Sequence, residues 1–181
     1  MNYEYIKQQL FDSSRILADL TADMVYDNPD LLKLLLEVSW MDEVPWCQRA
    51  SRVFAICCCR FPELVKPYAS SIISKLGNQK SESVRRNLLK IFTEINIKLS
   101  QRDKSKLLNL CFDYLTGPYS IGVQVYSMDI LYKLSLDYPE IQRELFEIIE
   151  NMLPGASVGF KSRGKKILDK MTQAARSIKL R

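Results

Sequence analysis

The most reactive side chains of this chain are those of its cysteines, three of which are consecutive: Cys57, Cys58 and Cys59. Neighbouring residues on a helix point about 100° apart, so three consecutive thiols in a helical segment cannot converge on one metal ion. The odd total of five does not suit a disulfide framework, and the absence of histidine removes the mixed zinc patterns. We therefore interpret the cysteines as small, reduced packing residues, with a redox or thiolate role as the alternative. Reduced thiols indicate a cytoplasmic protein.

The segment Gly155-Ala156-Ser157-Val158-Gly159 spells the Gly-x-Ser-x-Gly pattern of a nucleophile elbow. That elbow requires a strand before the serine and a histidine elsewhere in the chain. Here Pro154 precedes the segment and the chain contains no histidine. We interpret the segment as a turn between helices in which Ser157 caps the second helix. Paired acids such as Asp42-Glu43 are explained by solvated helix ends. The sequence thus offers no catalytic residue, metal site or cofactor motif, and we do not expect an enzyme.

The charge of the chain is unevenly distributed. Residues 155–181 carry eight basic side chains against one acidic, a net +7, and since the whole chain carries +5, the preceding residues carry −2. Five of the basic residues fall on neighbouring turns of a predicted helix and are candidates for contacts with phosphates or other anions: Lys161, Arg163, Lys165, Lys166 and Lys170. A polar helix that keeps the end of a stack soluble explains them too. An acidic protein and nucleic acid are the alternative partners.

Helices must position these residues, because apolar residues recur with helical spacing and nothing reads as a strand. Four segments share one pattern, anchored at Cys47, Val84, Val123 and Phe160, which are 37 to 39 residues apart. Further apolar residues follow seven, eight and eleven positions after each anchor: Phe54, Ala55 and Cys58; Ile91, Phe92 and Ile95; Ile130, Leu131 and Leu134; Ile167, Leu168 and Met171. A period of this length with helical spacing predicts stacked two-helix repeats.

Each predicted repeat contains a first and a second helix. The first helices, over 31–40, 64–76, 104–115 and 141–153, mostly follow a proline and an acid that suits the positive end of the helix dipole. The second helices start at about Pro45, Ser81, Ser120 and Ser157. Residues 3–26 read as helix in one or two pieces, with a possible break at Asp12-Ser13-Ser14.

These elements predict one all-α domain over residues 1–181. It divides into an N-terminal helical cap, 1–27, and four repeats, 28–61, 62–98, 99–137 and 138–181. No apolar run approaches the roughly 20 residues of a membrane span. The first five residues show no signal peptide, because they lack a basic stretch followed by an apolar core. We expect a cytoplasmic protein without a membrane partner.

The period, the paired helices and a basic residue near the start of a second helix, as in Val84-Arg85-Arg86, are similar to those of the HEAT/armadillo-like α-helical repeat superfamily. The resemblance covers residues 29–180, with 3–26 as a partial cap. The HEAT pattern usually has Asp or Pro ahead of that turn, which Pro45 alone echoes. The resemblance implies a right-handed α-α superhelix (solenoid) whose second helices line a concave surface. It implies no particular activity.

We therefore interpret the chain as a non-catalytic protein-binding or scaffold module that uses the concave face. The alternative is a nucleic-acid-binding HEAT-like protein, since one such family, the DNA glycosylases that act on alkylated bases, holds DNA in a basic concave groove. None of that family's motifs aligns here. On the second helices, positions two, six and nine after the anchor lie opposite the core stripe. Four such residues are predicted to contact a partner protein: Arg49, Arg86, Lys90 and Tyr132. We expect Arg86, Lys90 and Tyr132 to contribute more to partner binding than Lys179 or Arg181.

Overall fold

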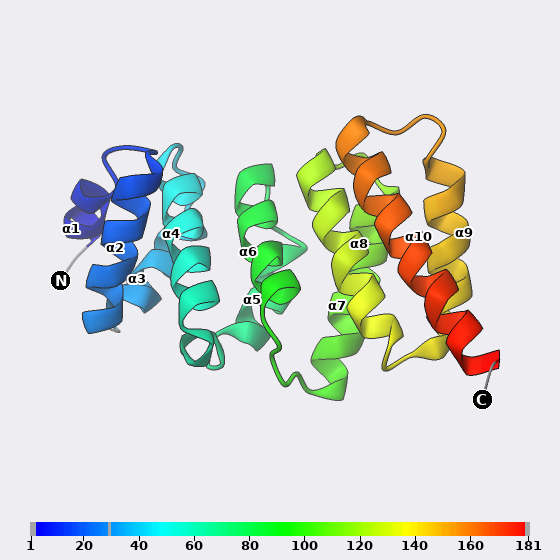
Figure 1. Cartoon of the computed structure of the whole chain (residues 1–181). Coiled ribbons are helices and arrows are strands. Elements are labelled where there is room, and N and C mark those ends of the chain that lie inside the picture. Colours follow the sequence, from blue (N-terminus) through cyan, green and yellow to red (C-terminus); the bar gives the residue numbers. More distant parts are fainter. Residues whose placement is uncertain (1–2, 29, 180–181) are drawn as a thin grey trace. The chain divides into compact units, whose positions relative to one another are not determined.

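The computed structural model describes residues 3–28 and 30–179, with the side chains of the last helix as far as Ala174. Within these residues the chain forms ten α-helices, two short 3-10 helices and no strand (Figure 1), so the predicted all-α fold is confirmed. The elements are α1 Tyr3–Gln9, α2 Arg15–Asp27, α3 Asp30–Ser39, α4 Trp46–Arg60, η1 Pro62–Val65, α5 Ala69–Leu76, α6 Glu82–Glu94, α7 Gln101–Thr116, α8 Ile121–Ser135, η2 Pro139–Ile141, α9 Gln142–Met152 and α10 Val158–Lys179.

Serine side chains start several second helices, as the sequence predicts. The backbone N–H of Leu17 donates to Ser14 Oγ at 3.2 Å at the start of α2. The N–H of Phe160 donates to Ser157 Oγ at 3.3 Å at the start of α10. Such a bond satisfies one of the amide groups that the first turn of a helix leaves without a partner. Ser157 therefore lies at a helix cap, as we interpreted the Gly-x-Ser-x-Gly segment.

Two prolines that precede first helices, Pro62 and Pro139, open 3-10 turns rather than α-helices. The sequence predicts a continuous helix over 64–76, but Pro62 starts η1 and α5 begins only at Ala69. Pro67 explains the difference, because a proline has no N–H to donate and its ring clashes with the carbonyl four residues earlier. Pro139 likewise opens η2 before α9 begins at Gln142.

The chain divides into two compact units, residues 1–103 and 104–181. In the first unit α1 packs against α3, α2 against α4, and α4 against both α3 and α6. Figure 1 shows the second helices α2, α4 and α6 in a row, in blue, cyan and green. The residues predicted as a cap thus form a helix pair that packs on the next one. The core of this unit is apolar and buried, with Ile6, Leu35, Phe54, Ile72 and Leu88 among its members.

In the second unit α10 packs against α8 and α9. The core includes Tyr114, Met128, Leu145, Phe160 and Ile167, all of them buried. Gly164 lets α10 approach α9 closely. A Cβ at this position would lie 3.1 Å from a methyl carbon of Ile149 and 3.2 Å from one of Leu153, so a larger residue would push the two helices apart.

The repeated apolar pattern lies in the core, as predicted. All four anchors are buried, and so are the residues seven and eleven positions after each of them. Among the residues eight positions after the anchors, Ala55, Phe92 and Leu131 are buried and Leu168 is half-buried. Equivalent positions of successive second helices therefore have equivalent environments.

Polar side chains connect successive second helices at equivalent positions. Asn87 Nδ2 on α6 donates to the carbonyl oxygen of Gln48 at 3.3 Å and to Ser51 Oγ at 3.0 Å, both on α4. Arg163 on α10 donates from Nε and Nη2 to Asp129 Oδ2 on α8, at 2.8 and 2.6 Å. Asn87 and Arg163 each lie three positions after an anchor, on the flank that faces the preceding second helix.

Candidate functional site

The cysteines show the environment of packing residues. Cys57 and Cys58 are buried and Cys59 is half-buried. Burial raises the pKa of Cys57 to about 12 and also raises the pKa of Cys58 and Cys111. These thiols are therefore neutral at neutral pH, whereas the thiolate is the nucleophile and the metal ligand.

Neither a metal centre nor a membrane-spanning helix is found in the described part of the chain. No group of three or more Cys, Asp or Glu side chains there could hold a metal ion. No helix among the same residues is long and apolar enough to cross a membrane.

An open depression of about 480 Å³ lies beside the turns that precede α4 and α6. Asp42, Cys47, Lys80 and Glu82 contribute to its lining, and Lys80 Nζ lies 3.6 Å from Asp42 Oδ2. Burial raises the pKa of the Cys47 thiol, and this residue is almost fully covered. The Cys47 thiol in this lining is therefore not an activated nucleophile.

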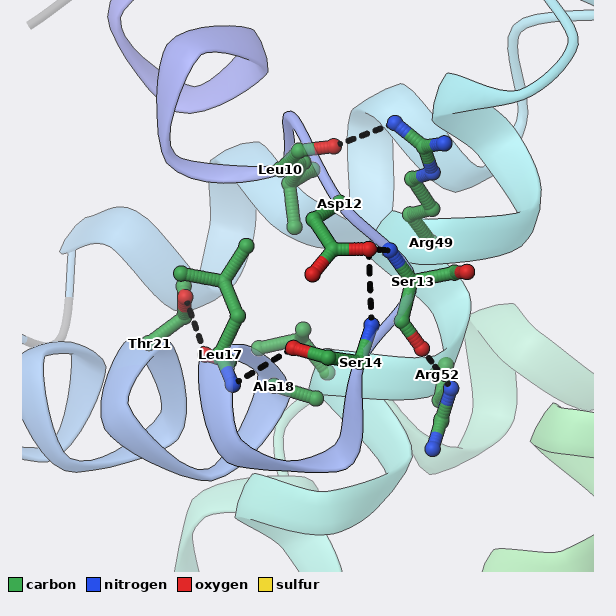
Figure 2. Close-up of a pocket in the computed structure, with 10 residues that line it drawn as sticks. Leu10, Asp12, Ser13, Ser14, Leu17, Ala18, Thr21, Arg49 and Arg52 are labelled. Atoms are coloured by element: carbon green, nitrogen blue, oxygen red, sulfur yellow. Dashed lines mark hydrogen bonds between the residues drawn. The ribbon is translucent and has the colours of Figure 1, made fainter.

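Arg49, one of the predicted partner contacts, lies on α4 and reaches the turn between α1 and α2 (Figure 2). Its Nη1 donates to the carbonyl oxygens of Leu10 at 2.9 Å and Phe11 at 2.7 Å. Arg52 Nη1 donates to the carbonyl oxygen of Ser13 at 2.6 Å. The cavity beneath the turn measures about 10 Å³, room for about one water molecule. Arg49 therefore helps to hold the N-terminal helix pair on α4.

The side of α4 that lies opposite its core stripe is less exposed than the helical pattern indicates. Val53 and Ile56 lie opposite the core stripe of α4, yet both are buried because α2 packs against this side. On α6, Arg86 is exposed and Lys90 is half-buried. Arg86 Nη2 donates to the neighbouring Asn87 Oδ1 at 3.5 Å, a long hydrogen bond.

Two basic residues of α4 and α6 already form ion pairs with carboxylates within the fold. Arg60 pairs with Asp19 at 2.9 Å and with Asp23 at 2.8 Å, and Arg85 pairs with Glu82. Four others have no carboxylate within ion-pairing distance among the described residues. We call these four the α4–α6 basic group: Arg49, Arg52, Arg86 and Lys90.

In the second unit, Tyr132 and Arg163 serve the packing of α10 on α8. Lys170 Nζ lies 5.6 Å from the centre of the half-buried Tyr132 ring, within the range of a cation–π contact. Arg163 bonds Asp129, whose pKa burial raises even though the guanidinium favours the charged form. Tyr132 lies in the second unit and the α4–α6 basic group lies in the first.

The candidate anion contacts on α10 have different environments. Arg163 is paired with Asp129 and Lys170 lies over Tyr132, whereas Lys165 and Lys166 are exposed and Lys161 is half-buried. Lys179 and Arg181, with which we compared the predicted partner contacts, lie outside the residues whose side chains are described.

Sequence reasoning missed Arg52 and Asn87. Arg52 lies five positions after its anchor, where the other repeats carry Leu89, Met128 and Lys165, so no shared signal identifies it. Asn87 lies three positions after Val84, where the other repeats carry Ala50, Tyr126 and Arg163. A polar residue beside the core stripe is the signal that would have found this contact between helices.

Comparison with protein families matches residues 18–171 to the HEAT repeat domain. The matched region begins in α2 and ends in α10, so it includes five second helices. This agrees with the helical solenoid predicted from the 37- to 39-residue spacing. No curated protein and no solved structure matches the chain. The match lends no support to an alkylated-base DNA glycosylase.

Proposed function

Because the chain belongs to the HEAT repeat domain family, we propose that it is a non-catalytic scaffold that binds another protein through its second helices. Helical repeats of this kind stack into extended surfaces that suit large partners. The observation that carries the proposal is the α4–α6 basic group. None of its four cations lies within ion-pairing distance of a described carboxylate, whereas Arg60 and Arg85 on the same helices are paired.

Arg86 and Lys90 are the two members best placed for a partner. They lie four residues apart on α6, so their side chains project from the same side of the helix one turn apart. Arg86 is exposed, and neither residue is tied to a backbone carbonyl as Arg49 and Arg52 are. Arginine is enriched among the residues that dominate protein interfaces. A partner with carboxylates one helical turn apart would satisfy both cations.

Tyr132 is the proposed contact in the second unit. Tyr132 is half-buried and Lys170 Nζ lies 5.6 Å from the centre of its ring, so the uncovered part of this side chain lies beside a cation. Tyrosine combines a large apolar surface with a hydroxyl that can form a hydrogen bond, a combination common at interfaces. The variant Tyr132→Phe keeps the ring under Lys170 and tests the hydroxyl alone.

Affinity capture from the source cell, after nuclease digestion of the extract, tests the proposal. The bait is compared with the double variant Arg86→Glu/Lys90→Glu and with Lys33→Glu/Lys66→Glu, which changes the net charge equally at exposed lysines elsewhere. We expect at least one captured protein to be lost with the first variant and kept with the control. Capture that is unaffected by Arg86→Glu/Lys90→Glu, or lost entirely on nuclease digestion, contradicts the proposal.

A further inference from the structure

Unpaired positive charge in the second unit gathers on α10. Elsewhere in this unit Lys104 pairs with Asp137 at 2.6 Å and Arg143 with Glu147 at 2.8 Å. On α10 itself Arg163 pairs with Asp129. Lys161, Lys165 and Lys166 form no ion pair with any described residue. These three lysines, together with Lys170 over Tyr132, are here called the α10 lysine face.

Packing fixes the direction in which this face points. The opposite side of α10 is buried through Phe160, Gly164, Ile167 and Met171. The lysines form two pairs with a spacing of four residues, 161 with 165 and 166 with 170, so the members of each pair lie one turn apart. At about 100° per residue the two pairs lie roughly 140° apart around the helix, on either flank of its exposed side. The face spans about 14 Å of helix axis at 1.5 Å per residue. It is therefore two pairs of cations held on one helix rather than a flexible basic tail.

We infer that the α10 lysine face binds an acidic segment of a partner protein. A segment that crosses the exposed side of α10 can place carboxylates beside both pairs. Ammonium groups are compact point charges that pair with carboxylates without demanding one geometry. This surface carries none of the residues of the α4–α6 basic group, so it is a second interaction surface and goes beyond the proposed function.

Two features of α10 favour an acidic protein segment over nucleic acid. Asp169 is exposed between the two lysine pairs and would repel a continuous line of phosphates, whereas a protein segment can place an uncharged or basic residue there. Over the described side chains, α10 exposes no aromatic residue on which a base could stack, because Phe160 is buried.

The test measures binding of a fluorescein-labelled peptide of about twelve Glu and Asp residues to the full chain by fluorescence anisotropy at low and at physiological salt. The variant is Lys161→Glu/Lys165→Glu/Lys166→Glu. Its control is Lys33→Glu/Lys66→Glu/Lys98→Glu, which changes the net charge equally at exposed positions outside α10. We expect about tenfold weaker binding for the α10 variant and a loss below about threefold for the control, since individual exposed ion pairs contribute little.

The proposal and the proposed function fail separately. Arg86→Glu/Lys90→Glu removes cations of α6 and leaves those of α10, so it should weaken peptide binding less than the α10 variant does. Equal losses from the α10 variant and the lysine control would overturn the inference, because the effect would then be general electrostatics. Tighter binding of a duplex DNA or of anionic vesicles than of the peptide, lost with the same lysines, would overturn the partner class. If circular dichroism shows that the Glu variant is misfolded, the corresponding Gln variant decides, and wild-type affinity in that variant contradicts the inference.

Discussion

At the scale of single residues, burial separates the three consecutive cysteines. Cys57 and Cys58 are covered by the core, whereas Cys59 is half-buried beside Lys90, whose charge partly offsets the rise that burial causes in its pKa. We predict that a thiol reagent at neutral pH labels Cys59 of the native chain first and Cys57 and Cys58 much more slowly. Peptide mapping by mass spectrometry measures the order. Fast, stoichiometric labelling of all three would contradict the packing interpretation.

The raised pKa of Cys57 also predicts a dependence of stability on pH. Its pKa is about 12 in the fold and 9.0 for a free thiol. Between these values the unfolded chain has lost the thiol proton and the folded chain keeps it, so the free energy of unfolding falls as pH rises. We predict a smaller fall from pH 9 to 10.5 for Cys57→Ala than for wild type in urea denaturation. Identical changes in both would show that this thiol does not titrate differently on folding.

At the scale of the element, a single helix provides a matched test of the repeat pattern. In α8, Ile130 is 2% exposed and lies seven positions after its anchor, whereas Ile121 is 49% exposed. Ile130→Ala should lower the free energy of unfolding by about 2–5 kcal/mol, because it removes buried carbons and leaves a cavity. Ile121→Ala, the control, should cost well under half as much. A loss below about 1 kcal/mol for Ile130→Ala would mean that the register is wrong.

The hydrogen bonds between second helices provide another test at this scale. Asn87→Ala removes both bonds from α6 to α4 and leaves the carbonyl of Gln48 without this donor. We expect a loss of about 1–2 kcal/mol in the free energy of unfolding, as for other half-buried hydrogen bonds. Asn109→Ala on an exposed position of α7 is the control and should change stability little. Equal effects of the two substitutions would show that the connection between α6 and α4 contributes nothing.

The start of the second repeat shows where sequence reasoning about elements failed. The proline and acid that precede a first helix were recognised, but Pro67, five positions further on, was not weighed. Its missing N–H divides the predicted helix into η1 and α5. The cap at Ser157 was predicted correctly because a cap depends on local hydrogen bonding that the sequence itself shows.

At the scale of the whole molecule, the repeat period made the fold class predictable. Apolar residues at fixed intervals after Cys47, Val84, Val123 and Phe160 require a helical stack, and the family match agrees. The predicted repeat boundaries stay a prediction. The site was less predictable, because a helical wheel shows which side of a helix faces away from its own core but not which neighbour covers that side. Val53 is buried where α2 packs on α4, and Arg163 forms an ion pair with Asp129, although the helical pattern alone leaves both residues open to solvent.

The central claim, that this HEAT repeat chain binds a protein through α6, is tested most directly by calorimetric titration of a captured partner. Arg86→Ala and Lys90→Ala should each weaken binding about fivefold or more, the loss expected at an energetically important contact. Lys66→Ala, an exposed lysine outside the α4–α6 basic group, should stay within about twofold of wild type. Unchanged affinity for both α6 variants, with a loss on substitution of Lys179 or Arg181 instead, would contradict the account and place the site at the C-terminal end of α10.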